Sequence, residues 1–470
     1  MYKKDVRGEL ILGNKSYGDI TNDVLRSQET KAPLWWKISF LVSLIIMLIG
    51  LGGFVPYTIS KGIGVWGNNN QVVWGWAIIN FVWWIGIGHA GTAFSIFLLV
   101  FRQKWRTSIN RAAEAMTVFA VLSAGIFPVI HVGRPWDEIF IFPYGANSRG
   151  LWVNFNSPLL WDVFAILTYL TTSAIFWYIG MLPDFATIRD RSTGLKKKIF
   201  TAVSLGWVGK MSTWRKFEDA LAILGGLAMP LVIAVHSIVS TDFAAGILPG
   251  WHETIFPPFF VVGAIFSGFS MVVTLMVLIR KAFKLEEYVT DEHFDAIARI
   301  ITFVSLIMGS AYLIEVFIAW YSANQYEDYV FVENFAKFSG HYAFPYWLMI
   351  VFNAFLPQLF WFKKIRRNLT AIFIITIGVN IGMWLERYNI VVPPAAEDFL
   401  PANWFHYSST IVDKWIYAGT AGLFVVGVLL FIRFIPMLAM NELKQQAKRH
   451  TELKPTDEEK DSLKNLLNNE

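Results

Sequence analysis

Two polar residues beside a Gly-, Pro- and Trp-rich loop have side chains suited to proton transfer. His131 closes the apolar stretch 109–131, and Asp162 lies in the first turn of the apolar stretch that opens at Pro158. If both stretches cross a bilayer, the two side chains lie at the same membrane face, just inside the hydrocarbon edge. An imidazole and a carboxylate there can accept protons from a molecule whose apolar tail stays in lipid. A quinol is such a molecule, because its oxidation releases two protons with its electrons.

Three further residues are expected to contact the same head group. Arg134 follows His131 in the loop, Trp161 directly precedes Asp162, and Asp242 ends the fifth apolar stretch. A structural interpretation stays open for the His131–Asp162 pair and for Asp242. An interfacial His–Asp pair can serve only to tie two helices together, and Asp242 can be an ordinary carboxylate at a helix end.

Several ionisable residues fall within other apolar stretches, where a charge is costly and therefore suggests a function. His89, in GIGHAGT, is either a proton relay or a histidine bonded to a neighbouring helix across small residues. Glu114 and Asp219 lie near helix ends and fit interfacial carboxylates. His236 is deep, and Glu315 is deep without a charged neighbour in sequence. We interpret the adjacent Glu386 and Arg387 as ordinary anchors at a membrane interface.

The composition is typical of a membrane protein. The 470 residues are 55% hydrophobic and 16% charged, whereas a soluble domain has about 25% charged residues. Trp (21) and Phe (40) are abundant, as expected for aromatic belts at two interfaces. There is no cysteine, which excludes disulfides and cysteine-held iron–sulfur clusters on this chain. We also expect no haem, because the spans lack matched mid-membrane histidines, and the net charge of +5 does not indicate nucleic-acid binding.

Apolar stretches of about 20 residues can cross a hydrocarbon core of ~30 Å, and the chain has about ten of them. They cover 38–59, 72–101, 109–131, 158–181, 218–242, 256–280, 296–323, 342–362, 369–387 and 412–437. The sequence therefore predicts an all-α polytopic membrane protein. Its transmembrane domain covers 38–437, between a polar N-terminal arm over 1–37 and a polar C-terminal tail over 438–470.

Lys and Arg gather in alternate loops, which predicts the orientation. The rich segments are 102–111, 189–216, 280–284 and 363–367. The alternating segments contain few basic residues, namely Lys61, Arg134, Arg149, Lys337 and Arg387. Both termini are therefore expected in the cytoplasm of a bacterial inner membrane, with His131, Asp162 and Asp242 at the outer face. The aromatic outer loops suit docking of a protein outside the membrane.

Five features of the sequence resemble one known family. They are the polar N-terminal arm, GHAGT, FPVIHVGRPW, SPLLWD and the end of the fifth stretch with His236 and STDFA. Together they resemble the NrfD/PsrC-like membrane subunits of the polysulfide reductase family, and within it the branch found in bacterial alternative complex III. The resemblance covers nearly the whole chain.

This resemblance implies a fold and a site. It implies two four-helix bundles, here 72–242 and 256–387, with one flanking helix at each end of the transmembrane domain. It implies that the chain holds no redox centre and binds quinol, in this case menaquinol, near the outer face. The catalytic positions of the family fall on His131 and Asp162, and a further family position falls on Asp242.

The resemblance also implies partners. Electrons would pass to a periplasmic iron–sulfur subunit, then to multihaem cytochrome subunits and a terminal oxidase, beside a homologous membrane subunit. Proton translocation is proposed for such membrane subunits. The candidates for a proton path are then His89, Glu114, Asp219, His236 and Glu315.

Two other functions stay open. The chain can be a sister subunit that conducts protons or is purely structural, without binding quinol. It can also be a secondary transporter, but such proteins have broken helices around a mid-membrane site. The polar residues here cluster instead at the outer edge.

Overall fold

The computed structural model describes residues 10–13, 15–101, 103–141, 150, 155–156 and 158–452. These residues form helices and connecting loops, without a strand among them. Ten helical segments in this part of the chain are long and apolar enough to cross a membrane. The prediction of an all-α polytopic membrane protein is confirmed.

The membrane-crossing segments begin and end as follows. They are α2–η1–α3 (Leu34–Met47, Leu48–Phe54, Val55–Lys61), α4 (Trp76–Val100), α5 with α6 (Asn110–Ala124, Ile126–His131), α8 (Pro158–Arg191), α10 (Met211–Ala244), α11 (Phe256–Phe283), α12 (Asp291–Ser322), α14–η6–η7 (Ala343–Ile350, Val351–Phe355, Leu356–Trp361), α16 (Leu369–Ala396) and α17 (Ile411–Phe434). Shorter elements connect them, namely α1 (Tyr17–Glu29), η2 (Ile63–Trp66), η3 (Lys104–Ser108), η4 (Pro135–Ile141), α9 (Gly194–Val203), α13 (Gln325–Glu327), η5 (Asp328–Ala336), α15 (Lys363–Arg366), η8 (Pro401–Asn403) and α18 (Met440–Glu452).

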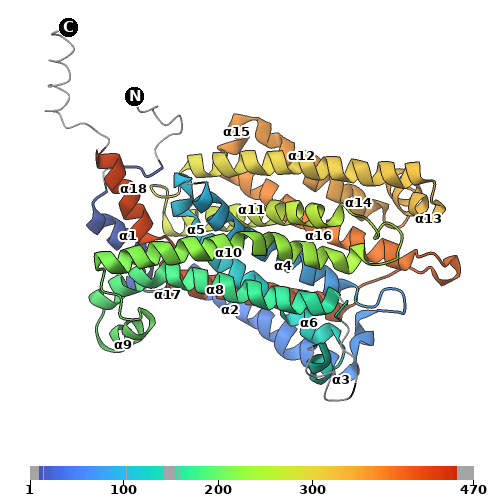
Figure 1. Ribbon diagram of the computed structural model, residues 1–470, viewed down its shortest axis with the longest axis horizontal. Helices are drawn as coiled ribbons and strands as arrows, with labels where there is room; N and C mark the ends of the chain where they lie inside the picture. Colours follow the sequence, from blue (N-terminus) through green and yellow to red (C-terminus); the bar gives the residue numbers. More distant parts are fainter. Residues whose placement is uncertain are drawn as a thin grey trace, which may run out of the picture.

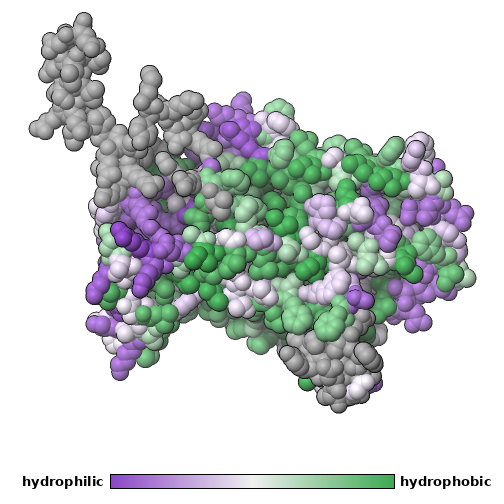
Figure 2. Space-filling view, in the orientation of Figure 1, coloured by the Kyte–Doolittle hydropathy of each residue, from purple (hydrophilic) through white to green (hydrophobic). Residues whose placement is uncertain are grey.

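The long helices run side by side along the longest axis of the molecule (Figure 1). We call the end with α1, α9 and α18 the basic end, because the Lys- and Arg-rich segments gather there, and the opposite end, with α3, α6 and α13, the aromatic end. Hydrophobic residues cover much of the middle of the face shown in Figure 2, and hydrophilic residues gather toward its two ends. This distribution is the one expected of a membrane protein, in which the middle faces the hydrocarbon core and the two ends face water and lipid head groups.

The helices make two rings of contacts. In the first, α4 packs on α5 and α10, and α8 packs on the same two helices. In the second, α11 packs on α12 and α16, and the segment α14–η6–η7 packs on both of those. The rings meet where α4 and α10 contact α11. Outside the first ring, α2 packs along α17, which in turn contacts α5.

A glycine allows α4 and α5 to approach closely. A Cβ atom on Gly91 would collide with the carbonyl of Ala113 and the hydroxyl of Thr117. Small residues let two membrane helices bring their backbones together, where packing and polar contacts hold them. The close approach buries the middle of α4, including His89, which is 1% exposed.

Two helix ends lie beyond the predicted ones. The fourth stretch continues from 181 to Arg191, and the ninth continues from 387 to Ala396 through Pro393 and Pro394. Proline cannot supply a backbone N–H, so Pro394 leaves the carbonyl of Ile390 without its usual helical donor. The indole N–H of Trp251 donates to this carbonyl at 2.7 Å. A side chain from the loop before α11 therefore stabilises the end of α16, where proline would otherwise favour an earlier end of the helix.

Candidate functional site

His131 lies at the end of α6, at the aromatic end of the molecule. The short helix α6 packs against α4 and α5, and the imidazole is 5% exposed. The ring of Trp74 lies 4.8 Å from it, centroid to centroid, at an angle of 34°. The Nδ1 atom has no hydrogen-bond partner among the described residues. His131 is thus a buried imidazole with one aromatic wall and an unused polar atom.

Asp162 and Asp242 come together at the same end of the first ring. Asp162 is in the first turns of α8 and Asp242 in the last turn of α10, and these helices pack along each other. The two carboxyl groups are close enough to interact electrostatically. All four carboxylate oxygens are buried, and none accepts a hydrogen bond with normal geometry from a described residue. His131 lies at the same end of the molecule, but no hydrogen bond or ion pair among the described residues joins it to either aspartate. We call His131, Asp162 and Asp242, which share this end, the aromatic-end site.

Two residues predicted to join this site point elsewhere or stay at the surface. Trp161 is 39% exposed, and its indole N–H donates to the carbonyl of Phe155 at 2.6 Å. Arg134 is exposed in the loop after α6. No hydrogen bond within the described residues joins either one to His131 or to the two aspartates. The Gly-, Pro- and Trp-rich loop after His131 is described only in part, and Arg149 lies outside the described residues.

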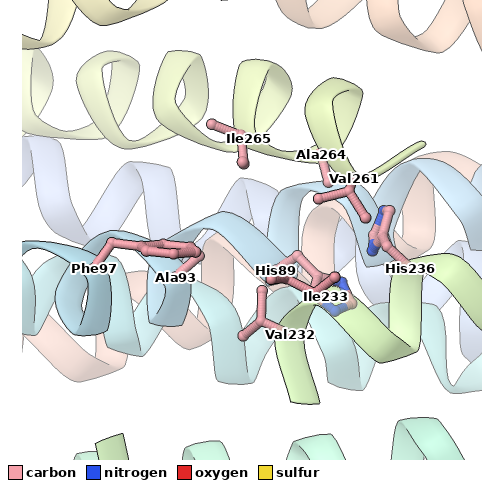
Figure 3. Close-up of a pocket in the computed structure, with 9 residues that line it drawn as sticks. All are labelled: His89, Ala93, Phe97, Val232, Ile233, His236, Val261, Ala264 and Ile265. Carbon is pink, nitrogen blue, oxygen red and sulfur yellow. The ribbon is translucent and has the colours of Figure 1, made fainter. Parts of the chain in front are cut away.

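His89 and His236 meet in the middle of the membrane domain. Their ring centroids are 4.0 Å apart at an angle of 85°, and Figure 3 shows them beside a small apolar cavity. That cavity has a volume of about 10 Å³, enough for about one water molecule. His89 Nδ1 contacts the carbonyl of Ile85 at 3.1 Å. His89 Nε2 and both nitrogens of His236 have no hydrogen-bond partner among the described residues.

Polar side chains continue from His89 toward the basic end. The ring of Tyr169 stacks on His89 at 4.5 Å, and its hydroxyl donates to the carbonyl of Gly88 at 3.1 Å. The hydroxyl of Thr92 donates to that of Ser173 at 3.2 Å. One turn further along α4, Ser95 donates to Glu114. The interpretation of Glu114 as an interfacial carboxylate is wrong, because it is 7% exposed and faces α4 inside the ring.

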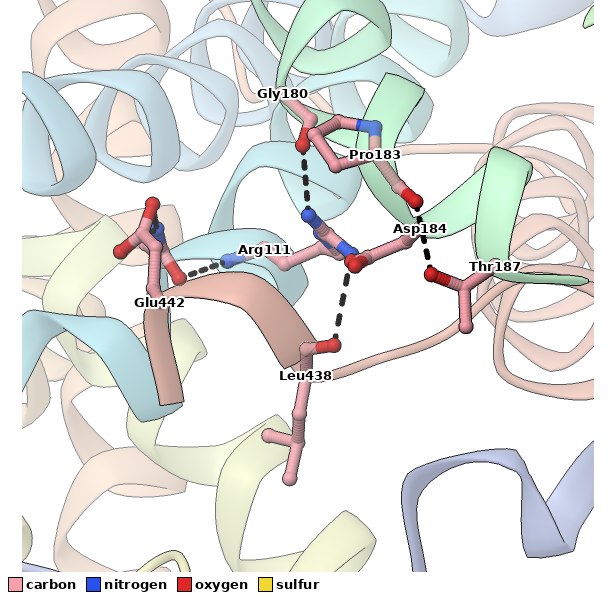
Figure 4. A network of polar contacts seen from close by, with 8 residues as sticks. Arg111, Gly180, Pro183, Asp184, Thr187, Leu438 and Glu442 are labelled. Carbon is pink, nitrogen blue, oxygen red and sulfur yellow. Dashed lines mark hydrogen bonds and ion pairs between the residues drawn. The ribbon is translucent and has the colours of Figure 1, made fainter. Parts of the chain in front are cut away.

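A buried ion pair closes this series at the basic end. Arg111 pairs with Asp184, and its guanidinium also donates to the carbonyl of Gly180 at 2.8 Å (Figure 4). Both side chains are at most 5% exposed. Asp219, by contrast, is exposed near the start of α10. The structure therefore brings His89, His236 and Glu114 into one interior series and leaves Asp219 at the surface.

A second polar cluster lies inside the second ring. Glu386 and Arg387 on α16 form an ion pair at 2.9 Å, with each side chain at most 3% exposed. The hydroxyl of Tyr312 on α12 donates to Glu386, and the guanidinium of Arg387 lies 4.2 Å from the ring centroid of Phe260. The interpretation of this pair as surface anchors is wrong, because α16 continues for nine residues beyond it. The sequence did contain a sign of this buried ion pair, because two adjacent residues of opposite charge lie at the end of an apolar stretch.

Glu315 lies next to this cluster. It lines a small cavity of about 10 Å³ together with Tyr312 and Glu386, and it interacts electrostatically with Glu386 and Glu253. Glu253 lies in the loop between α10 and α11. Its burial, followed by the nearby Glu327 charge, raises the pKa of Glu253 to about 7. Acidic groups thus extend from Glu386 to a loop at the aromatic end.

The family of the chain follows from comparison with known proteins. Residues 64–396 match the family described as "Polysulphide reductase, NrfD". The chain belongs to the NrfD family. The match runs from η2 to the end of α16 and so includes both rings of helices, the aromatic-end site and both interior clusters. The family prediction is confirmed, and this NrfD-family chain is a multi-pass integral membrane protein.

Two curated relatives of the NrfD-family chain are similar over most of their length. It is 22% identical to a selenate reductase subunit of Mesobacillus selenatarsenatis over 444 residues, which cover 90% of this chain and 98% of that protein. It is 21% identical to the "Hdr-like menaquinol oxidoreductase integral membrane subunit" of Archaeoglobus fulgidus over 429 residues, which cover 87% of this chain and 96% of that protein. Both names describe parts of oxidoreductases.

Proposed function

We propose that this chain is the quinol-binding membrane subunit of a respiratory oxidoreductase and that the aromatic-end site binds the quinol head group. The observation that carries the proposal is a set of buried polar atoms that make no hydrogen bond to another described residue, apart from the contact between the two carboxyl groups themselves. They are Nδ1 of His131 and the four carboxylate oxygens of Asp162 and Asp242. A buried polar atom without a hydrogen bond costs about 1–3 kcal/mol. A ligand with hydroxyl groups would remove that cost.

The chemistry of the site suits quinol oxidation. The Trp74 ring beside His131 offers an apolar surface for the quinol ring, while the tail stays in lipid. As electrons leave, the hydroxyl protons pass to the imidazole and to the carboxyl pair. Two carboxyl groups in contact can hold one proton between them. Electrons leave for an iron–sulfur cluster on a partner subunit, since this chain has no cysteine to hold one.

The relatives support the class of complex. One of them is named as part of a menaquinol oxidoreductase, so we propose menaquinol as the quinol. We assign the chain to the ActC membrane component of alternative complex III, on the motifs GHAGT, FPVIHVGRPW and SPLLWD. Its partners are then a periplasmic iron–sulfur subunit, a homologous membrane subunit, multihaem cytochromes and a terminal oxidase.

Titration of the purified complex with a fluorescent quinone analogue tests the site. We expect quenching at about one site in the wild type and its loss in His131→Ala and in Asp162→Asn, with the complex still assembled. His252→Ala changes an exposed histidine in a loop at the same end and should leave quenching intact. Undiminished binding and quinol oxidation in both site variants would contradict the proposal and leave His131 and Asp162 with structural roles only.

We propose proton conduction as a second function, carried by the interior series of polar groups. This series connects Glu114, Ser95, Tyr169 and His89 with His236. His236 in turn interacts electrostatically with Arg387 of the second ring. Protons entering at the basic end would therefore have successive polar groups as far as His236. Arg387 beyond it cannot accept a proton, and it is paired with Glu386, which interacts electrostatically with Glu315. The alternative of a sister subunit predicts this conduction without any quinol binding.

The complex reconstituted in liposomes tests proton conduction. We expect Glu114→Gln and His236→Phe to abolish quinol-driven proton movement across the membrane while binding of the quinone analogue persists. Asp219→Asn is the control, because this carboxylate is exposed outside the series. Unchanged proton movement in Glu114→Gln and His236→Phe would refute the route without touching the quinol proposal.

Purification of the native protein separates these functions from transport. A respiratory subunit should leave the membrane together with chains that hold haem and iron–sulfur clusters. A lone stable chain that moves a solute across liposomes would favour a secondary transporter.

A further inference from the structure

A hollow at the basic end lies apart from the aromatic-end site and from both interior clusters. Its volume is about 220 Å³, and it lies between α1, the start of α2, the turn after α11 and the end of α17. Trp35 and Trp36, at the start of α2, form part of its wall. The indole N–H of Trp36 donates to the carbonyl of Leu429 at 2.9 Å, which fixes that wall against α17.

Positive charge dominates the lining of the hollow. Arg26, Lys31, Lys284 and Arg433 line it, and Asp23 is the one acid among its lining residues. Asp23 is already paired with Lys15 at 3.1 Å and accepts a hydrogen bond from Tyr288 at 2.7 Å. The hollow therefore has a clear excess of positive charge, which favours an anionic ligand.

The polar groups that line the hollow differ in whether they already have hydrogen-bond or ion-pair partners. Arg433 donates to the carbonyls of Ser27 and Thr30, so it fastens the end of α1 to α17. The side-chain hydroxyl of Ser27 is buried and has no partner among the described residues. Arg26, Lys31 and Lys284 are exposed and form no ion pair within the described part of the chain. Three cations and one hydroxyl are thus available to a ligand.

An apolar stripe leads away from the hollow along α2. Leu34, Ile38, Leu41 and Ile45 are each at least 47% exposed, and their spacing of three or four residues places them on one face of the helix. No residue of α2 is buried. The stripe runs from the start of α2 toward the middle of the membrane. Acyl chains can pack along such an apolar face, whereas a free inorganic anion would gain no favourable contact with it.

We propose that this hollow binds the head group of an anionic phospholipid, with the acyl chains along the exposed stripe of α2. Basic pockets between membrane helices recognise anionic head groups at the interface, and Trp side chains favour that depth. The cations neutralise the phosphate, and the two indoles lie beside the glycerol region. The proposal is independent of quinol binding, because the hollow and the aromatic-end site lie at opposite ends of the helices.

The test uses the full chain, purified in neutral detergent and stripped of lipid. Binding of dioleoyl-phosphatidylglycerol, dioleoyl-phosphatidylcholine and inorganic phosphate is measured by native mass spectrometry and by the shift in melting temperature. We expect phosphatidylglycerol alone to bind and stabilise the wild type. In Lys31→Gln/Lys284→Gln its affinity should fall by about fivefold for each cation removed.

A matched control distinguishes the hollow from general surface charge. Lys196→Gln/Lys198→Gln removes two exposed lysines of α9 at the same end of the molecule and should leave the affinity unchanged. Equal binding of phosphatidylcholine, equal stabilisation by phosphate, or an equal loss in the control would each overturn the proposal. If the test variant fails to fold, the comparison of the three probes on the wild type still decides.

Discussion

Arg387 shows how a charge is kept inside the membrane domain. Its guanidinium is paired with the adjacent Glu386 and lies against the ring of Phe260, and Glu386 accepts a hydrogen bond from Tyr312. A buried ion pair of this kind adds little stability relative to apolar residues, yet removal of one partner leaves an uncompensated charge. The cost of breaking the pair therefore falls on the charge that remains.

We predict that Arg387→Met destabilises the protein by about 3–5 kcal/mol and that Glu386→Leu/Arg387→Met recovers much of this loss. Unfolding of the detergent-purified chain measures both. The exposed pair Lys337–Glu333 provides the control, since Lys337→Met should cost at most about 1 kcal/mol. An Arg387→Met variant as stable as Lys337→Met would contradict this account.

Glu253 gives a prediction for pH. Burial raises its pKa from 4.5 to about 7, so the folded protein binds this proton more tightly than the unfolded chain does. Stability from this group is therefore greatest below pH 4.5 and is lost as the pH rises to about 7. We expect Glu253→Gln to raise the melting temperature relative to the wild type at about pH 8, and the difference to vanish near pH 4.5. A difference that does not change with pH would exclude this residue as the cause.

Individual polar residues were only partly predictable. His89, His131, Asp162 and His236 stood out because ionisable groups in apolar stretches are rare. Asp242 was expected at the same site as Asp162, but the contact between His89 and His236 was not predicted, because it joins helices that are far apart in sequence. Tyr312 carried no signal, since a tyrosine in an apolar helix is ordinary until its hydroxyl is seen beside a carboxylate.

At the scale of elements, the first membrane segment packs closely on α17 at Gly50. A Cβ atom on Gly50 would collide with the carbonyl of Trp415, whereas a Cβ atom on Gly53 would meet nothing within 4 Å. Both glycines lie in η1. The two positions therefore differ in packing while sharing their local backbone and their depth.

We predict that Gly50→Val separates the first membrane segment from α17 and lowers the melting temperature by several degrees, because backbone atoms of α17 cannot move aside. Gly53→Val should leave the melting temperature nearly unchanged. Differential scanning fluorimetry of the two variants in one detergent makes the comparison. Equal effects would mean that the close approach at Gly50 does not hold the helices together.

The number of helices was predictable, because each segment that crosses the hydrocarbon core must be apolar over about 20 residues. The ends of the helices were less predictable. The predicted end at 387 treated Glu386 and Arg387 as anchors at the membrane interface. Trp251 supplies the donor that makes the longer helix possible. A bond between segments so far apart in the chain has no trace in local sequence.

At the scale of the whole molecule, the prediction concerns its orientation in the membrane. Because the chain contains no cysteine, single cysteines can be placed without a background signal. We expect a membrane-impermeant thiol reagent to label His252→Cys in cells with a permeable outer envelope and to label Lys197→Cys only after the inner membrane is disrupted. Both positions are exposed, and they lie at opposite ends of the helices. The reverse pattern would invert the topology and place the aromatic-end site in the cytoplasm.

The pairing of the first and last membrane segments also bears on how the protein is made. The main helical partner of α2 is α17, which begins at Ile411, more than three hundred residues after α2 ends at Met47. Ribosomes add about 5–20 residues per second, so the first segment waits in lipid for roughly 20–75 s before its partner is synthesised. During that interval its apolar surface is open to membrane chaperones and proteases. Completion of the chain, and not insertion of its first segment, therefore commits the newborn protein to its final packing.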